Sequence, residues 1–499
     1  MSKKDDFSII GRGALIATLG ILLQRISKFV IVMLQIKYLG LKQYGLFVIC
    51  LSYILILGMI QSIGLRGLVK FCVQHRISKN SGSLWAIFLS SIFLPIITGT
   101  VISILSYIVI SFLQLDLHTH QIFLCFLLLF PLFGSAEIPL LLTTSFETNA
   151  YLSLGRDIIS PIVEIIGLAI VVLFDIPGGI FAIICIFAFR KFVMYTVAVY
   201  AFTTLCRLEN IATHNLFDSL RIIRCHIKEI KEAVLYCLPL LYGNVFLKAS
   251  QLLDVIILGA IVSNETTGAY QIAVYLANLV ASAGAITLSM FSSIVSKHYQ
   301  KRDLAAINIA YIHSIKLSVL LGFPAAIILF SFSENILSIF STQAHIASFA
   351  LKLLILGKSF HLLTGGVGMM LSMTDKAYLH TYNSFAASLI HILCCYIFIP
   401  WWSIDGAAFA TIISLIFINI LRVIQVYHFY NIHFVCQVTM YIVMLSFISI
   451  VITSSVKGFF TINIITIALF AISNYLFIWG ACWYCIFDNE EKKNITKFR

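Results

Sequence analysis

The sequence predicts an all-α protein that crosses a lipid bilayer about fourteen times. Of its 499 residues, 60% are hydrophobic and only 11% are charged, whereas roughly a quarter of the residues in an ordinary soluble domain are charged. Apolar stretches of about 20 residues, the length that a helix needs to cross the hydrocarbon core, recur along the whole chain. This composition excludes a soluble enzyme, a disordered chain and a secreted disulfide scaffold.

Each predicted helix is an apolar segment between short polar links. The fifth and thirteenth segments are short and the ninth begins with polar residues, so length alone allows thirteen to fifteen helices. The predicted helices are centred in residues 9–36, 44–64, 84–112, 122–144, 158–174, 178–206, 233–262, 268–291, 307–332, 349–373, 382–399, 406–427, 438–453 and 464–486.

Positive charge gathers in alternate links between these segments. If Lys3 and Lys4 are cytoplasmic, the links on the opposite side carry only Lys37, Lys42 and Lys457, and most other Lys and Arg residues fall in cytoplasmic links. The positive-inside rule therefore places both termini in the cytoplasm and requires an even number of helices, which favours fourteen. The net charge of +12 thus reflects the orientation of the chain in the membrane. We therefore expect no nucleic-acid partner.

The longest link, 207–232, divides the chain into similar halves. It is amphipathic, and matched positions support a duplication, since Arg25 precedes Gly45 by the same spacing as Lys248 precedes Gly268. The apolar residues of the link at helical spacing are Leu216, Leu220, Ile223, Ile227 and Ile230. The predicted domains are an N-lobe of six helices at 1–206, the cytoplasmic link at 207–232, a C-lobe of six helices at 233–430, and two further helices with a cytoplasmic tail at 431–499.

Charged residues within the predicted helices are the candidate functional residues, because a charge at the bilayer centre costs about 2.5–3.5 kcal/mol. The candidates for binding an anion such as a pyrophosphate are Arg25, Lys28, Lys248 and Lys358. The acids in the spans, candidates for ion coupling or internal pairing, are Glu137, Glu164 and Asp254.

Two interpretations of these charges remain open. The cations could line a water-filled cavity between the two halves, or they could reach the interface by snorkelling. Arg190 and Lys191 could also pair with Glu137 or Glu164 in neighbouring helices.

Other chemistry has weak support. No GxxxxGK[ST] motif is present, so we expect no ATP hydrolysis. The pair His118 and His120 lacks a third ligand, and we expect neither a metal nor a cofactor. Prolines and glycines within the segments are candidate helix breaks, namely Pro95, Pro324, Gly365, Gly366 and Gly368.

Four short segments carry a resemblance to a known family. They are LQRISK at 23–28, KYLGLKQYGLF at 37–47, DVIILG at 254–259 and GAY at 268–270. These segments resemble the polysaccharide (O-antigen, Wzx-type) flippases, a branch of the superfamily that also contains the lipid II flippase and the MATE drug exporters. Helix count, central link and orientation extend the resemblance over nearly the whole chain.

The resemblance implies a V-shaped bundle of two six-helix lobes plus two extra helices. It implies a flippase, not an enzyme, that moves an undecaprenyl-pyrophosphate-linked oligosaccharide across the bacterial cytoplasmic (inner) membrane. The implied partners are the lipid-linked oligosaccharide and membrane lipids, with a polysaccharide polymerase and a chain-length regulator as further candidates. Arg25 matches a first-helix arginine of the family that engages the pyrophosphate, and Lys248 matches a seventh-helix cation.

Other classes of function predict different features. A MATE-like drug or metabolite exporter would favour a carboxylate-rich site over an excess of Lys and Arg. A membrane glycan polymerase would be expected to carry a large outer loop with catalytic residues or an Asp-x-Asp metal site. A structural scaffold gives no reason to place Arg25 and Lys248 inside helices.

Overall fold

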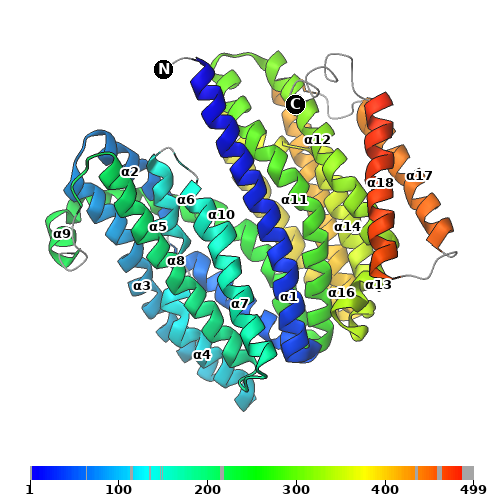
Figure 1. Cartoon of the computed structure of the whole chain (residues 1–499), viewed down its shortest axis with the longest axis horizontal. Helices are drawn as coiled ribbons and strands as arrows, with labels where there is room; N and C mark the ends of the chain where they lie inside the picture. The colour runs from blue at the N-terminus through cyan, green and yellow to red at the C-terminus, as the bar shows by residue number, and fades with distance from the viewer. Residues whose placement is uncertain are drawn as a thin grey trace. The chain divides into compact units, whose positions relative to one another are not determined.

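The protein consists of two compact units. The structure, a computed structural model, describes residues 3–62, 64–112, 116–133, 136–146, 148, 150–213, 219–432, 437–457 and 463–485. Residues Met1–Ile256 form the N-terminal unit and residues Ile257–Arg499 form the C-terminal unit (Figure 1). The division falls inside the helix α10 (Ile227–Ile261). The predicted domain boundaries at 206/207 and 232/233 stay a prediction.

The N-terminal unit is a bundle that starts with a long, bent helix. Its helices before α10 are α1 (Lys3–Gln61), α2 (Leu68–Ile77), α3 (Ser81–Phe112), α4 (Leu117–Phe133), α5 (Glu137–Leu142), α6 (Ala150–Ser153), α7 (Ser160–Leu173), α8 (Ile180–Leu208) and α9 (Ser219–Cys225). The bend in α1 lies at Gly40, whose φ of 72° is a left-handed conformation that a side chain would disfavour. The predicted helices 9–36 and 44–64 are therefore the two parts of α1.

The C-terminal unit contains two interrupted helices. Its helices after α10 are α11 (Asn264–Gln300), α12 (Leu304–Ser331), α13 (Ser333–Phe340), α14 (Ser348–Thr364), α15 (Val367–Ser372), α16 (Ala377–Tyr430), α17 (Gln437–Lys457) and α18 (Ile464–Cys485). Gly365, with φ 59°, separates α14 from α15, as the glycine pattern predicts. Ser403, with φ 51°, bends α16 between the predicted eleventh and twelfth helices.

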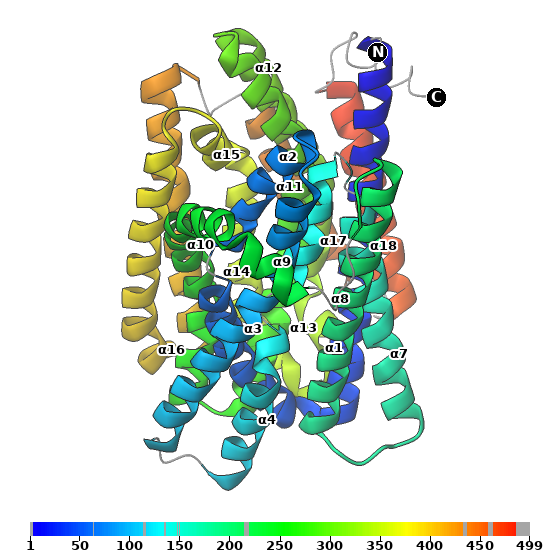
Figure 2. The same cartoon turned by 90° about the vertical axis from the view of Figure 1, so that its left-hand side faces the viewer.

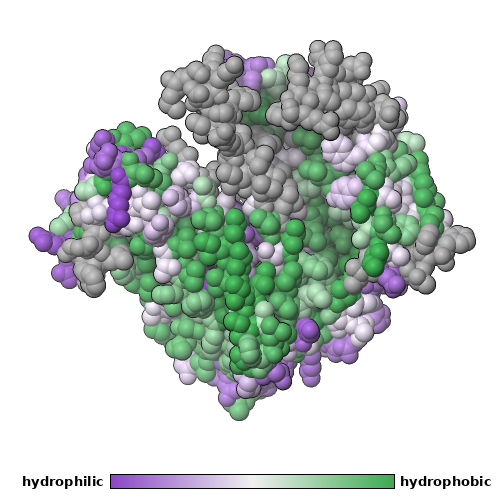
Figure 3. Space-filling model, in the orientation of Figure 1, coloured by the Kyte–Doolittle hydropathy of each residue, from purple (hydrophilic) through white to green (hydrophobic). Residues whose placement is uncertain are grey.

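The predicted fold class, an all-α polytopic membrane protein, is confirmed. Each of the fourteen predicted segments is helical over most of its described length, and no strand occurs among the described residues. Within that part of the chain, 7 helices are long and apolar enough to cross a membrane by length and composition, and shorter apolar helices accompany them. On the face shown in Figure 3, apolar side chains cover the middle of the N-terminal unit and hydrophilic ones gather around α2.

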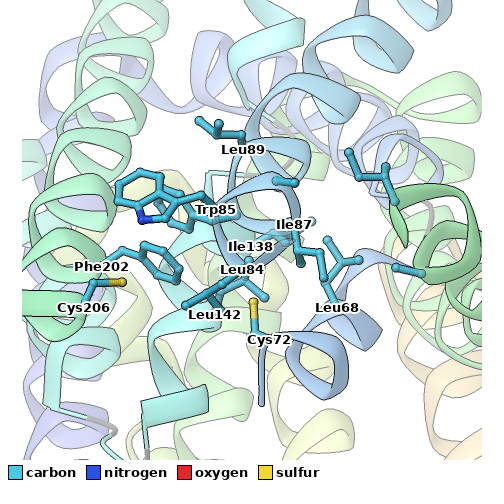
Figure 4. Close-up of a cluster of buried hydrophobic side chains, with 14 of the residues drawn as sticks. Leu68, Cys72, Leu84, Trp85, Ile87, Leu89, Ile138, Leu142, Phe202 and Cys206 are labelled. Atoms are coloured by element: carbon cyan, nitrogen blue, oxygen red, sulfur yellow. The ribbon is translucent and has the colours of Figure 1, made fainter. Parts of the chain in front are cut away.

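Aromatic side chains form the centre of the core of the N-terminal unit (Figure 4). The rings of Phe88 on α3 and Phe202 on α8 stack with centroids 3.9 Å apart. Trp85 meets both rings edge-on, at 5.8 Å and 5.5 Å. Such stacked and edge-to-face pairs stabilise a bundle beyond the area that they bury. They fix α3 against α8.

The core extends to the predicted amphipathic link. Residues 214–218, which include Leu216, lie outside the described residues, and the side chain of Leu220 is likewise not described. Ile222 on α9 and Ile230 on α10 are buried in the same cluster as Trp85, whereas Ile227 is exposed. Part of the apolar face of the link therefore packs on the bundle.

A glutamine at the end of α1 supports its junction with two proline-containing helices. Figure 2 shows α3 beside α4. Gln61, at the end of α1, is fully buried, and its Nε2 donates to the carbonyl oxygens of Pro95 in α3 at 2.7 Å and of Pro131 in α4 at 3.1 Å. A Cβ at Gly99 would lie 2.4 Å from that Nε2, so the glycine makes room for the amide. The bilayer offers no such donor, which explains the buried polar side chain here.

The last two helices attach to α12. Helices α17 and α18 both pack on it, and Tyr475 of α18 donates its hydroxyl to the Leu321 carbonyl at 3.1 Å. Between themselves α17 and α18 share a polar contact, in which Asn474 is hydrogen-bonded to Ser449 and to Thr453. Side-chain hydrogen bonds of this kind hold membrane helices together where lipid provides no hydrophobic drive.

We expect Phe202→Ala to destabilise the N-terminal unit, because it removes the stacked ring at the centre of the core. A Phe→Ala change in a packed core costs about 3–5 kcal/mol. The measurement is the unfolding temperature of the detergent-solubilised protein. The matched control is Tyr200→Ala on the same helix, where the side chain is 68% exposed and little change is expected. Equal losses in both variants would contradict the role of the aromatic cluster.

Candidate functional site

The polar stripe of α1 faces the interior of the N-terminal unit at one end. Arg25, Lys28 and Gln35 follow one another at helical spacing, and Arg25 and Lys28 are half-buried. Gln35 is only 3% exposed, and its Nε2 donates to Glu164 Oε1 on α7 at 3.4 Å. Lys28 lies close enough to Glu164 for the two charges to interact. The polar stripe of α1 therefore contacts α7 through Gln35, and its cations Lys28 and Arg25 lie further towards the N-terminus of α1.

Glu164 is bound mainly by an arginine of the next helix. Arg190 Nη1 on α8 lies 2.6 Å from Glu164 Oε2, and the Glu164 side chain is 4% exposed. Of the pairings that the sequence left open for Arg190 and Lys191 with Glu137 or Glu164, the structure contains that of Arg190 with Glu164. A buried ion pair of this geometry resists separation, because removing one partner leaves an uncompensated charge. It ties α7 to α8.

A second ion pair lies in the π-helical segment Leu154–Ile159 that leads into α7. The Arg156 side chain binds both carboxylate oxygens of Asp157, at 2.7 Å and 3.1 Å, and Asp157 is 1% exposed. A Cβ at Gly20 of α1 would lie 3.2 Å from Asp157 Oδ2, so α1 passes close to this pair. The sequence interpretation missed Asp157, although its position beside Arg156 was a visible signal.

Glu137 and Lys191 complete the charged cluster of this unit. Lys191 on α8 is 9% exposed, and Glu137 on α5 is exposed. Lys191 lies within electrostatic reach of Arg190, Glu137 and Glu164. The cluster contains the cations Lys28, Arg156, Arg190 and Lys191 and the acids Glu137, Asp157 and Glu164. Since Asp157 and Glu164 each bind an arginine, the cluster keeps an excess of positive charge.

The other candidates on α10 are only partly described. Lys248 lies on this helix, but its side chain is outside the described residues, so its predicted role stays a prediction. Asp254 is 3% exposed, and its Oδ1 accepts a hydrogen bond from the backbone N–H of Val255 at 2.8 Å.

In the C-terminal unit, Lys358 lies next to a polar network. Lys358 on α14 is half-buried, and His361, one turn later, lies within its electrostatic reach. His361 Nδ1 lies 3.0 Å from Asn419 Oδ1 on α16, and Thr364 donates its hydroxyl to the same oxygen at 3.0 Å. The network joins α14 to the second part of α16.

Arg422 is a buried cation that the sequence interpretation missed. It lies in the predicted twelfth helix, one turn beyond Asn419, and is 7% exposed. Its guanidinium lies within electrostatic reach of His361. The sequence did contain a signal for Arg422, because it is a charged residue inside an apolar segment. The same kind of signal made Lys358 a candidate.

Potential metal ligands do not cluster in the described part of the chain. There, no group of three or more His, Cys, Asp or Glu side chains is arranged to hold a metal ion. Besides its acids, the candidate site contains cations, amides and hydroxyls, groups that bind anions.

Helical units that bury charged clusters inside membrane-spanning bundles define a polytopic membrane transporter. The chain belongs to the polysaccharide biosynthesis protein family, whose model matches residues 10–291. A second family model, MatE, matches residues 239–399. No curated protein matches the chain.

Solved structures of the MOP superfamily share the fold. An inward-facing multidrug resistance MATE family transporter has a TM-score of 0.67 at 11% identity, covering 82% of this chain and 94% of its own. The lipid II flippase MurJ, in an inward closed conformation, has a TM-score of 0.66 at 16% identity, covering 93% and 99%. A MOP superfamily transporter from Pyrococcus furiosus, described as having a binding pocket of reverse polarity, has a TM-score of 0.59 at 13% identity, covering 85% and 95%. These likenesses establish the fold.

We expect Arg190→Leu and Glu164→Leu each to destabilise the protein by about 3–5 kcal/mol, because each leaves a buried charge without its partner. The double variant should regain most of the loss, since it buries no charge at this point. Unfolding temperatures in detergent measure the effect, with Phe189→Leu on the same helix as control, where the ring is 59% exposed. Additive losses in the double variant would show that the pair does not act as a unit.

Proposed function

We propose that the protein is a flippase that moves an undecaprenyl-pyrophosphate-linked oligosaccharide repeat unit across the bacterial cytoplasmic membrane. The product would serve the assembly of a surface polysaccharide such as O-antigen or capsule. The observation that carries the proposal is the excess of positive charge in the cluster of the N-terminal unit. That cluster lies within the segment matched by the polysaccharide biosynthesis family.

The chemistry of this substrate fits such a cluster. A pyrophosphate needs cations and N–H donors, whereas the lipid tail remains in the bilayer and needs none. Arg25 and Lys28 are proposed to engage the pyrophosphate, with Lys248 and Lys358 as further candidates. Glu164 and Asp157 form ion pairs with Arg190 and Arg156, and Lys28 and Lys191 add further positive charge to the same cluster.

The acids of the spans have separate proposed roles. The contact with Arg190 and Gln35 supports internal pairing for Glu164. Glu137 is exposed and remains a candidate for coupling transport to an ion. Asp254 stays a candidate for either role.

Location and partners follow from this proposal. Both termini would lie in the cytoplasm, and the two six-helix lobes would be the N-lobe at 1–206 and the C-lobe at 233–430. A polysaccharide polymerase and a chain-length regulator are proposed as partners, because translocated repeat units must next be joined. The protein itself makes and breaks no covalent bond in this scheme.

A MATE-like exporter of drugs or metabolites is the second candidate. The MatE match over residues 239–399 and the MATE structures of the same fold favour it. A cationic drug would need unpaired carboxylates, and Glu164 and Asp157 are bound to arginines. This argues for the anionic substrate.

The function is tested by deleting the gene. We expect surface polysaccharide to be lost while lipid-linked repeat units accumulate, because the cell still makes the unit but cannot move it. Lipid extraction and glycan staining measure the two quantities. Normal surface polysaccharide combined with altered drug sensitivity would contradict the flippase function and support the drug exporter.

Arg25→Ala should abolish or strongly reduce export while the protein still inserts and accumulates. A lost hydrogen bond to a charged group is worth about 1.5–3 kcal/mol, roughly ten- to a hundredfold in affinity. Arg25→Lys should restore part of the export, since it keeps the charge without the two-pronged contact. The readout is export per folded molecule.

The matched control for Arg25 is Lys42→Ala on the same helix. Lys42 is exposed, and we expect its loss to leave export unchanged. Wild-type export by a well-expressed Arg25→Ala protein would remove Arg25 from the proposed site. Loss of protein abundance that the Lys variant does not rescue would indicate a structural role instead.

A further inference from the structure

A helical segment at one end of the N-terminal unit carries positive charge along one side. Helix α9 continues into α10 through His226, because backbone hydrogen bonds join His226 to Ile222 and Ile230 to His226. Four exposed cations recur along this segment at every third or fourth residue, which places them on one side of the helix. This basic face consists of Arg221, Arg224, Lys228 and Lys231.

The opposite side of the segment is packed into the bundle. Ile222 and Ile230 are buried in the aromatic core cluster of the unit. On the same side, His226 Nδ1 lies 3.2 Å from Ser83 Oγ, near the start of α3. Gly82 makes room for the ring, since a Cβ there would lie 2.5 Å from His226 Nε2. This packing fixes the rotation of the helix, so the basic face stays on the outer side.

Membrane-spanning helices end beside this segment. The apolar span of α3 begins at Ser81, and α9 packs on α3 (Figure 2). The apolar span of α8 ends at Leu208, and the last turns of α8 share the core cluster with Ile222 and Ile230. Helix α10 continues from the basic face towards the apolar stretch Ala249–Ile261. The basic face therefore lies where apolar spans give way to polar residues, which is the level of the lipid headgroups.

Large apolar side chains are exposed at the same end of the unit. Ile227 follows His226 directly and lies among the four cations, and it is 57% exposed. Ile77 at the end of α2 and Leu208 at the end of α8 are also exposed. Exposure of this kind is unfavourable in water but favourable at the boundary between headgroups and acyl chains. Basic residues interleaved with exposed apolar ones are typical of helices that lie on a membrane surface.

The charge of the basic face is not neutralised within the described part of the chain. There, none of its four side chains forms an ion pair. Two nearby acids are engaged elsewhere, since Glu209 binds Arg76 at 2.8 Å and Glu229 lies 3.3 Å from His226 Nδ1. Glu232 adds one exposed negative charge. The segment therefore keeps an excess of positive charge on its outer side.

We propose that the basic face, together with Ile227, is a docking surface for anionic phospholipids of the leaflet in which α3 and α8 end. The four cations contact the lipid phosphates, and Ile227 enters the acyl boundary below them. A cluster of four or more Lys and Arg residues directly beside a membrane helix is typical of anionic-lipid recognition. A water-soluble acidic partner would match the charge but gives no reason to expose Ile227 at the level of the headgroups. The docking surface does not rest on the flippase function.

The test is lipid-dependent stability of the purified full-length protein in an uncharged detergent. Unfolding temperatures are measured while the mole fraction of phosphatidylglycerol in the micelles is raised, with phosphatidylcholine as the neutral reference. We expect a saturable rise with phosphatidylglycerol and a much smaller change with phosphatidylcholine. Higher ionic strength should increase the mole fraction needed, because exposed charges are screened. Equal responses to the two lipids would overturn the proposal.

Matched double variants locate the response. Lys228→Gln with Lys231→Gln should raise the mole fraction of phosphatidylglycerol at half-maximal stabilisation by about fivefold for each charge removed. The control, Lys37→Gln with Lys42→Gln, removes two exposed cations of α1 and should leave that midpoint unchanged. Both double variants should unfold at the wild-type temperature without lipid, since all four side chains are exposed. Equal midpoints in the two variants would show a general effect of charge and contradict the docking surface.

Further additions distinguish the lipid from other anions. Neither inorganic phosphate nor polyglutamate, each added without lipid, should reproduce the rise in unfolding temperature, because neither supplies an acyl boundary for Ile227. An equal rise with inorganic phosphate would assign the basic face to soluble anions and overturn the proposal. A rise with polyglutamate combined with no response to phosphatidylglycerol would assign it to an acidic protein and likewise overturn the lipid.

Discussion

The structure depends on one constraint, that a charge or polar group inside a bilayer must be satisfied by the protein, because lipid supplies no hydrogen bonds. The contact of Glu164 with Arg190 and Gln35 shows how this constraint shapes the N-terminal unit. Three helices, α1, α7 and α8, are joined by one carboxylate. The same requirement places Gln61 among the carbonyl oxygens of Pro95 and Pro131.

The two units satisfy the constraint with different chemistry. The N-terminal unit pairs buried acids with arginines, as in Arg156 with Asp157 and Arg190 with Glu164. The C-terminal unit joins α14 and α16 through neutral amides, hydroxyls and histidine around Asn419. In the described part of that unit, Arg422 is a buried cation without a carboxylate partner.

The ion pairs of the N-terminal unit affect the net charge that a transported substrate would encounter. A pair such as Arg190 with Glu164 leaves no net charge, so the remaining cations set the polarity of the cluster. A positive cluster inside an apolar bundle attracts anions far more strongly than the same charges would in water. That is the physical basis for expecting an anionic head group on the substrate of this member of the polysaccharide biosynthesis family.

The sequence by itself determined the helices and the membrane class, and it left open which of Arg190 and Lys191 pairs with Glu137 or Glu164. Hydropathy acts over whole segments, so an apolar run long enough to span a bilayer is visible without any tertiary contact. Gly365 was also visible as a break, because glycine is the residue that a left-handed conformation favours.

The tertiary structure alone decided which charges are compensated and where helices bend without glycine. Ser403 takes a left-handed conformation that its residue type does not announce, and Arg422 is buried because α15 and both parts of α16 close around it. Burial and pairing depend on which faces of distant segments meet. One-dimensional spacing does not contain that information, since residues such as Ser384 and Arg422 become neighbours only when the chain folds back on itself.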